Sequence, residues 1–269
     1  MSSDIEKIEL LRRIWQSKFD AIYCIHYLPF KERRARLEKE LARVGILDLD
    51  IFKWKFTFDN PFDRVSMSNP NLKYTRSNKR FNKGAYNLAM AHYDVMRESL
   101  ELGHKRILVM EDDVAFLKNL GSIIKIAWNV PKDYDIILFD KVSNNMSEYA
   151  SYITERLVNN SEGQLTGYAE FDLLWTTACL ALSEKGMKHI CECQENYLGV
   201  ADLYTNKYNP GIHQYKSSFE DSLKRCFSVR SLVCQVPNEN SINDHGETNS
   251  VYNQPGLYDC GMKMELYNV

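Results

Sequence analysis

The sequence predicts one α/β domain with a mixed, mostly parallel central sheet that is flanked by helices. Compact apolar runs of strand length alternate with amphipathic segments of helix length, which is the pattern of β–α–β units. The chain has 269 residues, of which 44% are hydrophobic, so it can bury a sizeable core. It contains no internal repeat and no low-complexity linker, and we therefore expect residues 1–269 to form a single domain.

The first part of the chain is predicted to hold three helices and three strands. Leu37, Leu41 and Val44 form the apolar stripe of the second helix, and Gly45 and Gly103 follow the second and third helices as stop signals. In chain order we expect a helix over 4–17, a strand over 19–27, a helix over 31–45, a strand over 51–59, a polar loop over 59–82, a helix over 84–103 and a strand that begins at residue 106.

The second part continues the alternation. Ser183 stands directly before an amphipathic segment and is its expected N-cap. In chain order we expect a helix over roughly 116–128, a strand over 133–140, a strand over 171–182, a helix over 183–196 and a last strand over 228–237.

Charge and composition exclude several classes of protein. The formal net charge is -2 and the pI is about 6.3, so no global basic field indicates a nucleic-acid partner. No long uncharged apolar stretch predicts a membrane-spanning helix, and the acidic N-terminus lacks the apolar region of a signal peptide. The seven cysteines are scattered without a CxxC pair, which indicates reduced thiols. We expect a cytoplasmic protein whose membrane contact, if it has one, is peripheral.

Three adjacent acids follow the apolar run 107–110, namely Glu111, Asp112 and Asp113. Binding sites of α/β sheets lie beyond the carboxyl ends of their strands, which is where these acids fall. Neighbouring carboxylates repel one another unless a cation or a donor neutralises them. The alternative is that Asp112 or Asp113 only caps the following helix. A cap needs one such residue, so three of them favour a metal site.

Two known families share this acid segment. Residues 106–120 resemble the start of a bacterial receiver domain, and the strand that ends at Asp140 resembles its phospho-acceptor strand. However, Asp113 and Asp140 are only 140 − 113 = 27 residues apart, which leaves room for one helix, whereas a receiver needs a further strand and helix between these acids. A receiver-like signalling module is therefore the disfavoured alternative.

The second resemblance covers most of the chain. The chain is similar to glycosyltransferase family 25, the lipooligosaccharide and collagen galactosyltransferases. The segment AIYCIHYLPFKERRARLEKELARVGI resembles the family's opening strand and arginine-bearing segment, and RILVMEDDVAF matches its acid motif. The helix KGAYNLAMAHYDVMRESLELG, the strand DYDIILF and the segment WTTACLALSEKGMKHI follow the family's order and spacing.

This resemblance implies a GT-A (nucleotide-diphospho-sugar transferase) fold and a metal-dependent, inverting transfer. The donor would be a UDP-sugar, with galactose or a similar hexose, and the acceptor a glycan such as a lipooligosaccharide, a polysaccharide or a glycoprotein. Departure of the diphosphate develops negative charge, which Mn²⁺ or Mg²⁺ held by carboxylates can neutralise. An inactive protein that only binds nucleotide sugars is the other alternative. The sequence does not indicate the oligomeric state.

The resemblance also implies roles for individual residues. Glu111 and Asp113 are the expected metal ligands, because alternate side chains of an extended segment share one face. Asp112 is expected on a ribose hydroxyl. The remaining assignments are Ile25, His26 and Arg33 at the donor, His245 beside Asp244 completing the metal shell, and Asp202 as the base, with Asp172 as the runner-up.

Each of these roles has a structural alternative. The segment with Asp244 and His245 also reads as a solvated loop. Arg33 and Arg34 also fit a solvated helix face, and His92 is more often a satisfied core histidine than a ligand.

Overall fold

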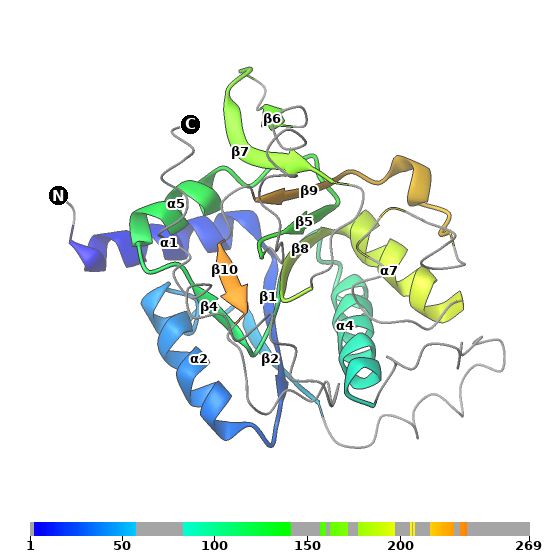
Figure 1. Cartoon of the computed structure of the whole chain (residues 1–269), viewed down its shortest axis with the longest axis horizontal. Coiled ribbons are helices and arrows are strands. Elements are labelled where there is room, and N and C mark those ends of the chain that lie inside the picture. The colour runs from blue at the N-terminus through cyan, green and yellow to red at the C-terminus, as the bar shows by residue number, and fades with distance from the viewer. Residues whose placement is uncertain are drawn as a thin grey trace, which may run out of the picture.

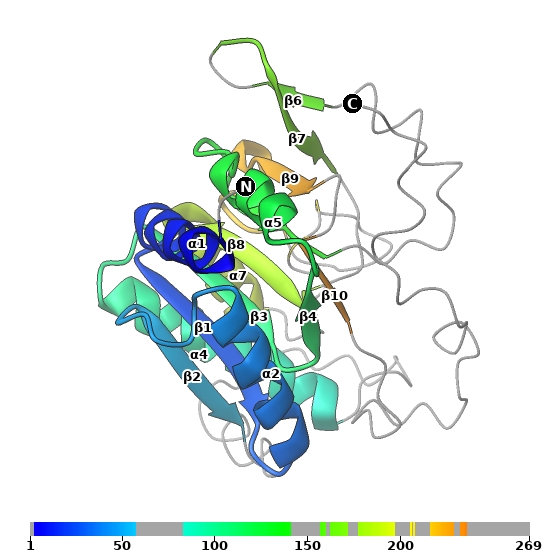
Figure 2. The same cartoon turned by 90° about the vertical axis from the view of Figure 1, so that its left-hand side faces the viewer.

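The computed structural model describes residues 3–57, 83–140, 157–159, 162–171, 177–196, 205, 207, 216–228 and 232–235. Within them, one eight-stranded sheet lies between two layers of helices (Figures 1 and 2). The first layer contains α1, α2 and α5, and the second contains α4 and α7. The helices are α1 Asp4–Lys18, α2 Lys31–Arg43, α4 Lys83–Glu101, α5 Leu120–Trp128 and α7 Glu184–Asn196, with the short 3-10 helix η1 at Glu220–Ser222.

The strands of the large sheet lie in the order β2-β1-β3-β8-β5-β9-β7-β6. A separate two-stranded sheet pairs β4 with β10. The strands are β1 Ala21–Tyr27, β2 Phe52–Thr57, β3 Arg106–Glu111, β4 Val114–Phe116, β5 Ile136–Leu138, β6 Leu157–Asn159, β7 Leu165–Glu170, β8 Cys179–Ser183, β9 Arg225–Ser228 and β10 Val233–Gln235.

The mixed α/β architecture is confirmed, but the expectation of a mostly parallel sheet is wrong. The β1–β2, β1–β3 and β5–β9 pairs are parallel. The β3–β8, β5–β8, β7–β9 and β6–β7 pairs are antiparallel. A strand that is buried on both faces reads as an apolar run whichever way it points, so its sequence does not reveal its direction.

The helices on the α1 side form for the reasons that their sequences predict. Ser3 and Glu6 make a capping box at the start of α1. Trp15 of α1 is buried, and its Nε1 donates to the carbonyl of Val44 at 2.9 Å. Gly45 follows Val44, the C-cap of α2, and has a φ of 73°, a conformation that glycine adopts without strain and that commonly ends a helix. The hydrogen bond from Trp15 to Val44 joins α1 to the end of α2.

The segment after the acids differs from the prediction. A helix was expected over roughly 116–128, but β4 comes first and α5 begins only at Leu120. Asn119 is the N-cap of α5, and its side chain accepts from the backbone N–H of Ser122. The last predicted strand, 228–237, contains β10, which pairs with β4, whereas Ser228 is the final residue of β9 in the large sheet. The predicted loop 59–82 lies outside the described residues.

Apolar side chains fill both spaces between the sheet and its helices. The sheet therefore holds its strand ends rigidly, which is what a site at those ends requires. Cysteines 24, 179, 191, 193 and 226 are free thiols in this core. Among the helices that the structure describes, none combines the length and the apolarity that crossing a bilayer demands.

Candidate site at the carboxyl ends of β1 and β3

The strand order reverses between β1 and β3. The chain passes from β1 through α2 to β2 on one side, and returns through α4 to β3 on the other side. Because β1 and β3 are parallel, their carboxyl ends meet at one edge of the sheet, with Ile25 beside Glu111 in register. Open α/β sheets bind ligands in the crevice at such a switch point.

The acids lie in a turn between two strands. β3 ends at Glu111, Asp112 and Asp113 form the turn, and β4 begins at Val114. Neither aspartate caps α5, because Asn119 does so, and the capping alternative is therefore wrong. The backbone from Glu111 to Asp113 was expected to be extended, so that the two side chains would share one face. This expectation is also wrong, because the backbone forms a turn there.

Asp112 is the most firmly held of the three acids. Its Oδ2 lies 2.7 Å from Nδ1 of the fully buried His26 and accepts from the backbone N–H of Tyr27 at 3.1 Å. Its Oδ1 accepts from Arg33 at 2.9 Å. Both carboxylate oxygens are thus engaged by the protein. Two of the residues expected at the donor, His26 and Arg33, contact Asp112, which is expected there as well.

Glu111 turns toward the helix layer of α4. Its Oε1 accepts from the Thr177 hydroxyl at 2.8 Å and lies 3.4 Å from Nε2 of His92. Ile25, the strand neighbour of Glu111, packs in the hydrophobic cluster on the same side. His92 is buried, as a satisfied core histidine would be, and it reaches the acid motif from α4.

Asp113 differs from its neighbours in one carboxylate oxygen. Its Oδ1 is buried and makes no hydrogen bond among the described residues. Burial, followed by the charges of Glu111 and Asp112, raises the pKa of Asp113 to about 7, while Arg33 and Arg36 act in the opposite direction. A buried carboxylate oxygen without a donor is costly when it is ionised, and a cation would relieve that cost.

The arginines of α2 do not share one environment. Arg33 is partly buried against Asp112, and its guanidinium lies over the Phe30 ring at 4.5 Å. Arg34 pairs with Glu38 and lies over the ring of Trp54.

The sequence did not predict two residues that contact the acids. Arg36 binds the backbone of the acid turn through its guanidinium, and Thr177 lies at the start of the segment that leads into β8. Their residue types carried no signal for these contacts.

Four predicted site residues, Asp172, Asp202, Asp244 and His245, lie outside the described residues. The structure does describe α7, which precedes Asp202 in the chain. The α7 residue Gln194 donates through Nε2 to the carbonyl of Ala89, in the first half of α4, at 3.0 Å. Because α4 leads into the start of β3, α7 returns the chain toward the edge of the sheet that carries the acids.

The described acids fit a metal ion only in part. No group of three or more His, Cys, Asp and Glu side chains is arranged to hold a metal within the described ranges. Asp113 nevertheless has a buried oxygen, without a hydrogen-bond partner in the described part of the chain, that a hard cation would take. Mg²⁺ is commonly bound by one or two carboxylates together with water and substrate phosphates. A cation bound by Asp113 would keep further coordination positions for water and for substrate phosphates.

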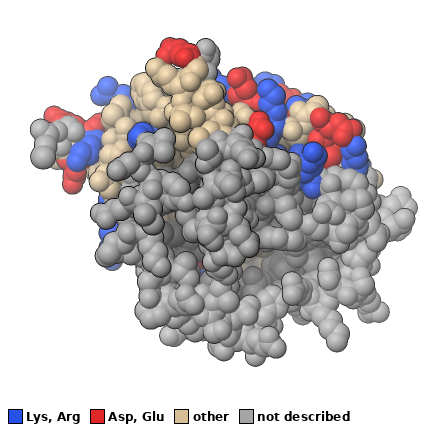
Figure 3. Space-filling view, turned by 45° about the horizontal axis from the view of Figure 1, so that its top comes forward, with Lys and Arg blue, Asp and Glu red and all other residues tan. Residues whose placement is uncertain are grey.

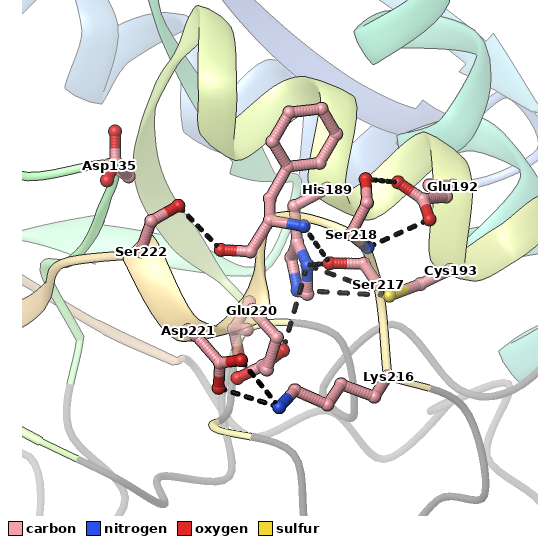
Figure 4. A network of polar contacts seen from close by, with 12 residues as sticks. Asp135, His189, Glu192, Cys193, Lys216, Ser217, Ser218, Glu220, Asp221 and Ser222 are labelled. Carbon is pink, nitrogen blue, oxygen red and sulfur yellow. Dashed lines mark hydrogen bonds and ion pairs between the residues drawn. The ribbon is translucent and has the colours of Figure 1, made fainter.

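Figure 4 shows a second polar cluster, which lies around His189 of α7. His189 of α7 lies 2.6 Å from the Ser217 hydroxyl and 3.8 Å from Glu220, and Glu220 pairs with Arg225 at 2.8 Å. Arg225 begins β9, whose carboxyl end points toward the acids, so this cluster is remote from them. Its buried charges are paired, and it joins α7 to the segment that contains η1.

On the face shown in Figure 3, the described Lys and Arg side chains are interspersed with Asp and Glu. No protein-family model matches the chain, and no curated protein matches it.

Proposed function

We propose that this protein is a metal-dependent, inverting glycosyltransferase of the GT-A fold, similar to family 25. It moves a hexose such as galactose from a UDP-sugar to a glycan acceptor, and it acts in the cytoplasm. The observation that carries this proposal is Asp113, whose buried oxygen has no partner among the described residues, beside two further acids at a switch point of the sheet. The resemblance of the surrounding segments supplies the class of reaction.

In this proposal the described residues have different roles at the site. Asp113 would hold Mn²⁺ or Mg²⁺, with Glu111 beside it. The ion, when bound, supplies positive charge that offsets the charge developing on the departing diphosphate. Asp112 orients Arg33 at the same turn, and a guanidinium in this position suits phosphate oxygens of the donor. Thr177 and His92 restrain Glu111 from the neighbouring elements.

Inversion also requires a base that removes the proton of the acceptor hydroxyl. We assign this role to Asp202, with Asp172 as the alternative. Loss of the base lowers the transfer rate more than it weakens UDP binding, because the base acts mainly in the transition state. Measuring both quantities for Asp202→Asn and Asp172→Asn decides between them, and a loss of UDP affinity in both variants would contradict either assignment.

The central test combines UDP binding with UDP release. In the presence of Mn²⁺, UDP at about 100 times its Kd should stabilise the protein by about 2.7 kcal/mol, which thermal unfolding detects. With excess chelator the stabilisation should vanish. Asp113→Asn should lose both this stabilisation and the release of UDP from UDP-sugars. Asp133→Asn, a change of the same chemistry at an exposed acid, is the matched control.

The outcomes separate the alternatives. Equal stabilisation by UDP in chelator would contradict a metal-bridged site. Metal-dependent UDP binding without release from any nucleotide sugar, at any acceptor tested, would indicate a nucleotide-sugar-binding protein that lacks catalysis.

A further inference from the structure

One face of α2 holds the segment that contains the acid turn. Arg36, Glu40 and Arg43 recur at spacings of four and three, so their side chains leave the helix on the same side. Glu40 accepts from the backbone N–H of Phe116 at 3.2 Å, and both arginines donate to backbone carbonyls between residues 112 and 118. This face of α2 therefore binds the backbone of residues 112–118 at several positions.

Arg36 differs from Arg43 in the backbone carbonyls that it binds. One terminal nitrogen donates to the carbonyl of Asp112 at 3.0 Å, and the other donates to the carbonyl of Val114 at 3.2 Å. These two residues flank Asp113. The rigid guanidinium fork thus fixes the backbone on both sides of the acid whose Oδ1 has no partner among the described residues.

We propose that Arg36 is the positioning residue of the metal site, because it sets the backbone from which Asp113 presents its carboxylate. This inference rests on the proposed function, since it assigns Asp113 as the metal ligand. Residues that orient a ligand typically change metal affinity by 10- to 100-fold when they are lost. Arg36 touches neither the metal nor the substrate in this role.

The direction in which Mn²⁺ affinity changes when Arg36 is replaced distinguishes a positioning role from a purely electrostatic one. A positive charge close to a cation site repels the cation, so by Coulomb's law alone the removal of Arg36 should strengthen Mn²⁺ binding. Positioning predicts the opposite, a loss of affinity. Arg36→Lys keeps the charge and replaces the planar fork by a single ammonium group, so it tests the geometry alone.

The experiment measures the affinity of the full-length protein for Mn²⁺ alone, by electron paramagnetic resonance of the free ion. We expect Arg36→Lys to bind Mn²⁺ 10- to 100-fold more weakly than the unchanged protein. Arg43→Lys is the matched control, because Arg43 donates to the carbonyls of Phe116, Leu117 and Lys118, farther along the same segment. It should keep its Mn²⁺ affinity within about twofold. Urea unfolding of each variant verifies that the titrated protein is folded.

Several results would overturn the inference. Unchanged affinity in Arg36→Lys, or an equal loss in Arg43→Lys, would contradict it while leaving the proposed function intact. Failure of the unchanged protein to bind Mn²⁺ would overturn both. If Arg36→Lys does not fold, Arg36→Gln takes its place with the same expected loss, and failure of both variants to fold would show that Arg36 serves the fold and not the site.

Discussion

Asp113→Asn tests whether the carboxylate of Asp113 destabilises the folded protein in the absence of metal, as expected for a binding residue, or stabilises it. In the unfolded chain the carboxyl ionises near its ordinary pKa of 3.8, whereas in the folded protein its pKa is about 7. Between these values the folded state binds more protons than the unfolded state. The free energy of unfolding therefore falls as the pH rises, by about 1.4 kcal/mol per pH unit, and levels off above pH 7.

Over the interval between the two pKa values, about three pH units, the free energy of unfolding falls by about 4 kcal/mol. Asparagine has nearly the same shape and carries no charge at any pH. In chelator, Asp113→Asn and the unchanged protein should therefore be about equally stable near pH 4. At pH 8 the variant should be more stable by up to about 4 kcal/mol. Urea unfolding at pH 4, 6 and 8 measures these differences.

The control is Asp112→Asn, a change of the same chemistry at the adjacent residue. Because Asp112 bonds to Arg33 and His26, its loss leaves a partly buried guanidinium without its counter-charge. We expect this variant to be destabilised by about 3 kcal/mol at pH 8. A difference between Asp113→Asn and the unchanged protein that does not vary with pH would refute the reasoning. So would a variant that is less stable than the unchanged protein at pH 8.

The remaining predictions concern the fold. Asn119→Ala should lower the free energy of unfolding by about 1 kcal/mol, because Asn119 caps α5; an unaffected urea midpoint would contradict this. Gly186→Ala should destabilise the protein by about 3 kcal/mol or more, because the new Cβ would overlap the carbonyl oxygen of Asp135. At Gly103 a Cβ meets no atom within 4 Å, so Gly103→Ala should cost only the strain of its positive φ, about 1 kcal/mol. Equal midpoints for the two glycine variants would contradict the clash at Gly186.

Much of the local structure is predictable from the sequence because it has local causes. The apolar stripe of α2 and the stop at Gly45 are confirmed, since helix periodicity and a positive φ depend on nearby residues alone. Ser183 accepts from the backbone N–H of Gly186 at 3.1 Å, as an N-cap should. The position of the acids directly after a buried strand is confirmed for the same reason. The start of α5 was predicted too early, because β4 exists only through its pairing with β10.

The sequence by itself determined which residues form the α/β elements and that three acids end a buried strand. Only the tertiary structure decided strand direction, strand order and the partners of each acid. Hydrophobic patterns record which faces are buried, and burial is the same for a strand of either direction. Hydrogen bonds depend on distance in space: Asp112 meets His26 across 86 positions of the chain, and Glu111 meets Thr177 across 66. The folded chain engages two neighbouring acids in this way and leaves the Oδ1 of Asp113 without a partner among the described residues.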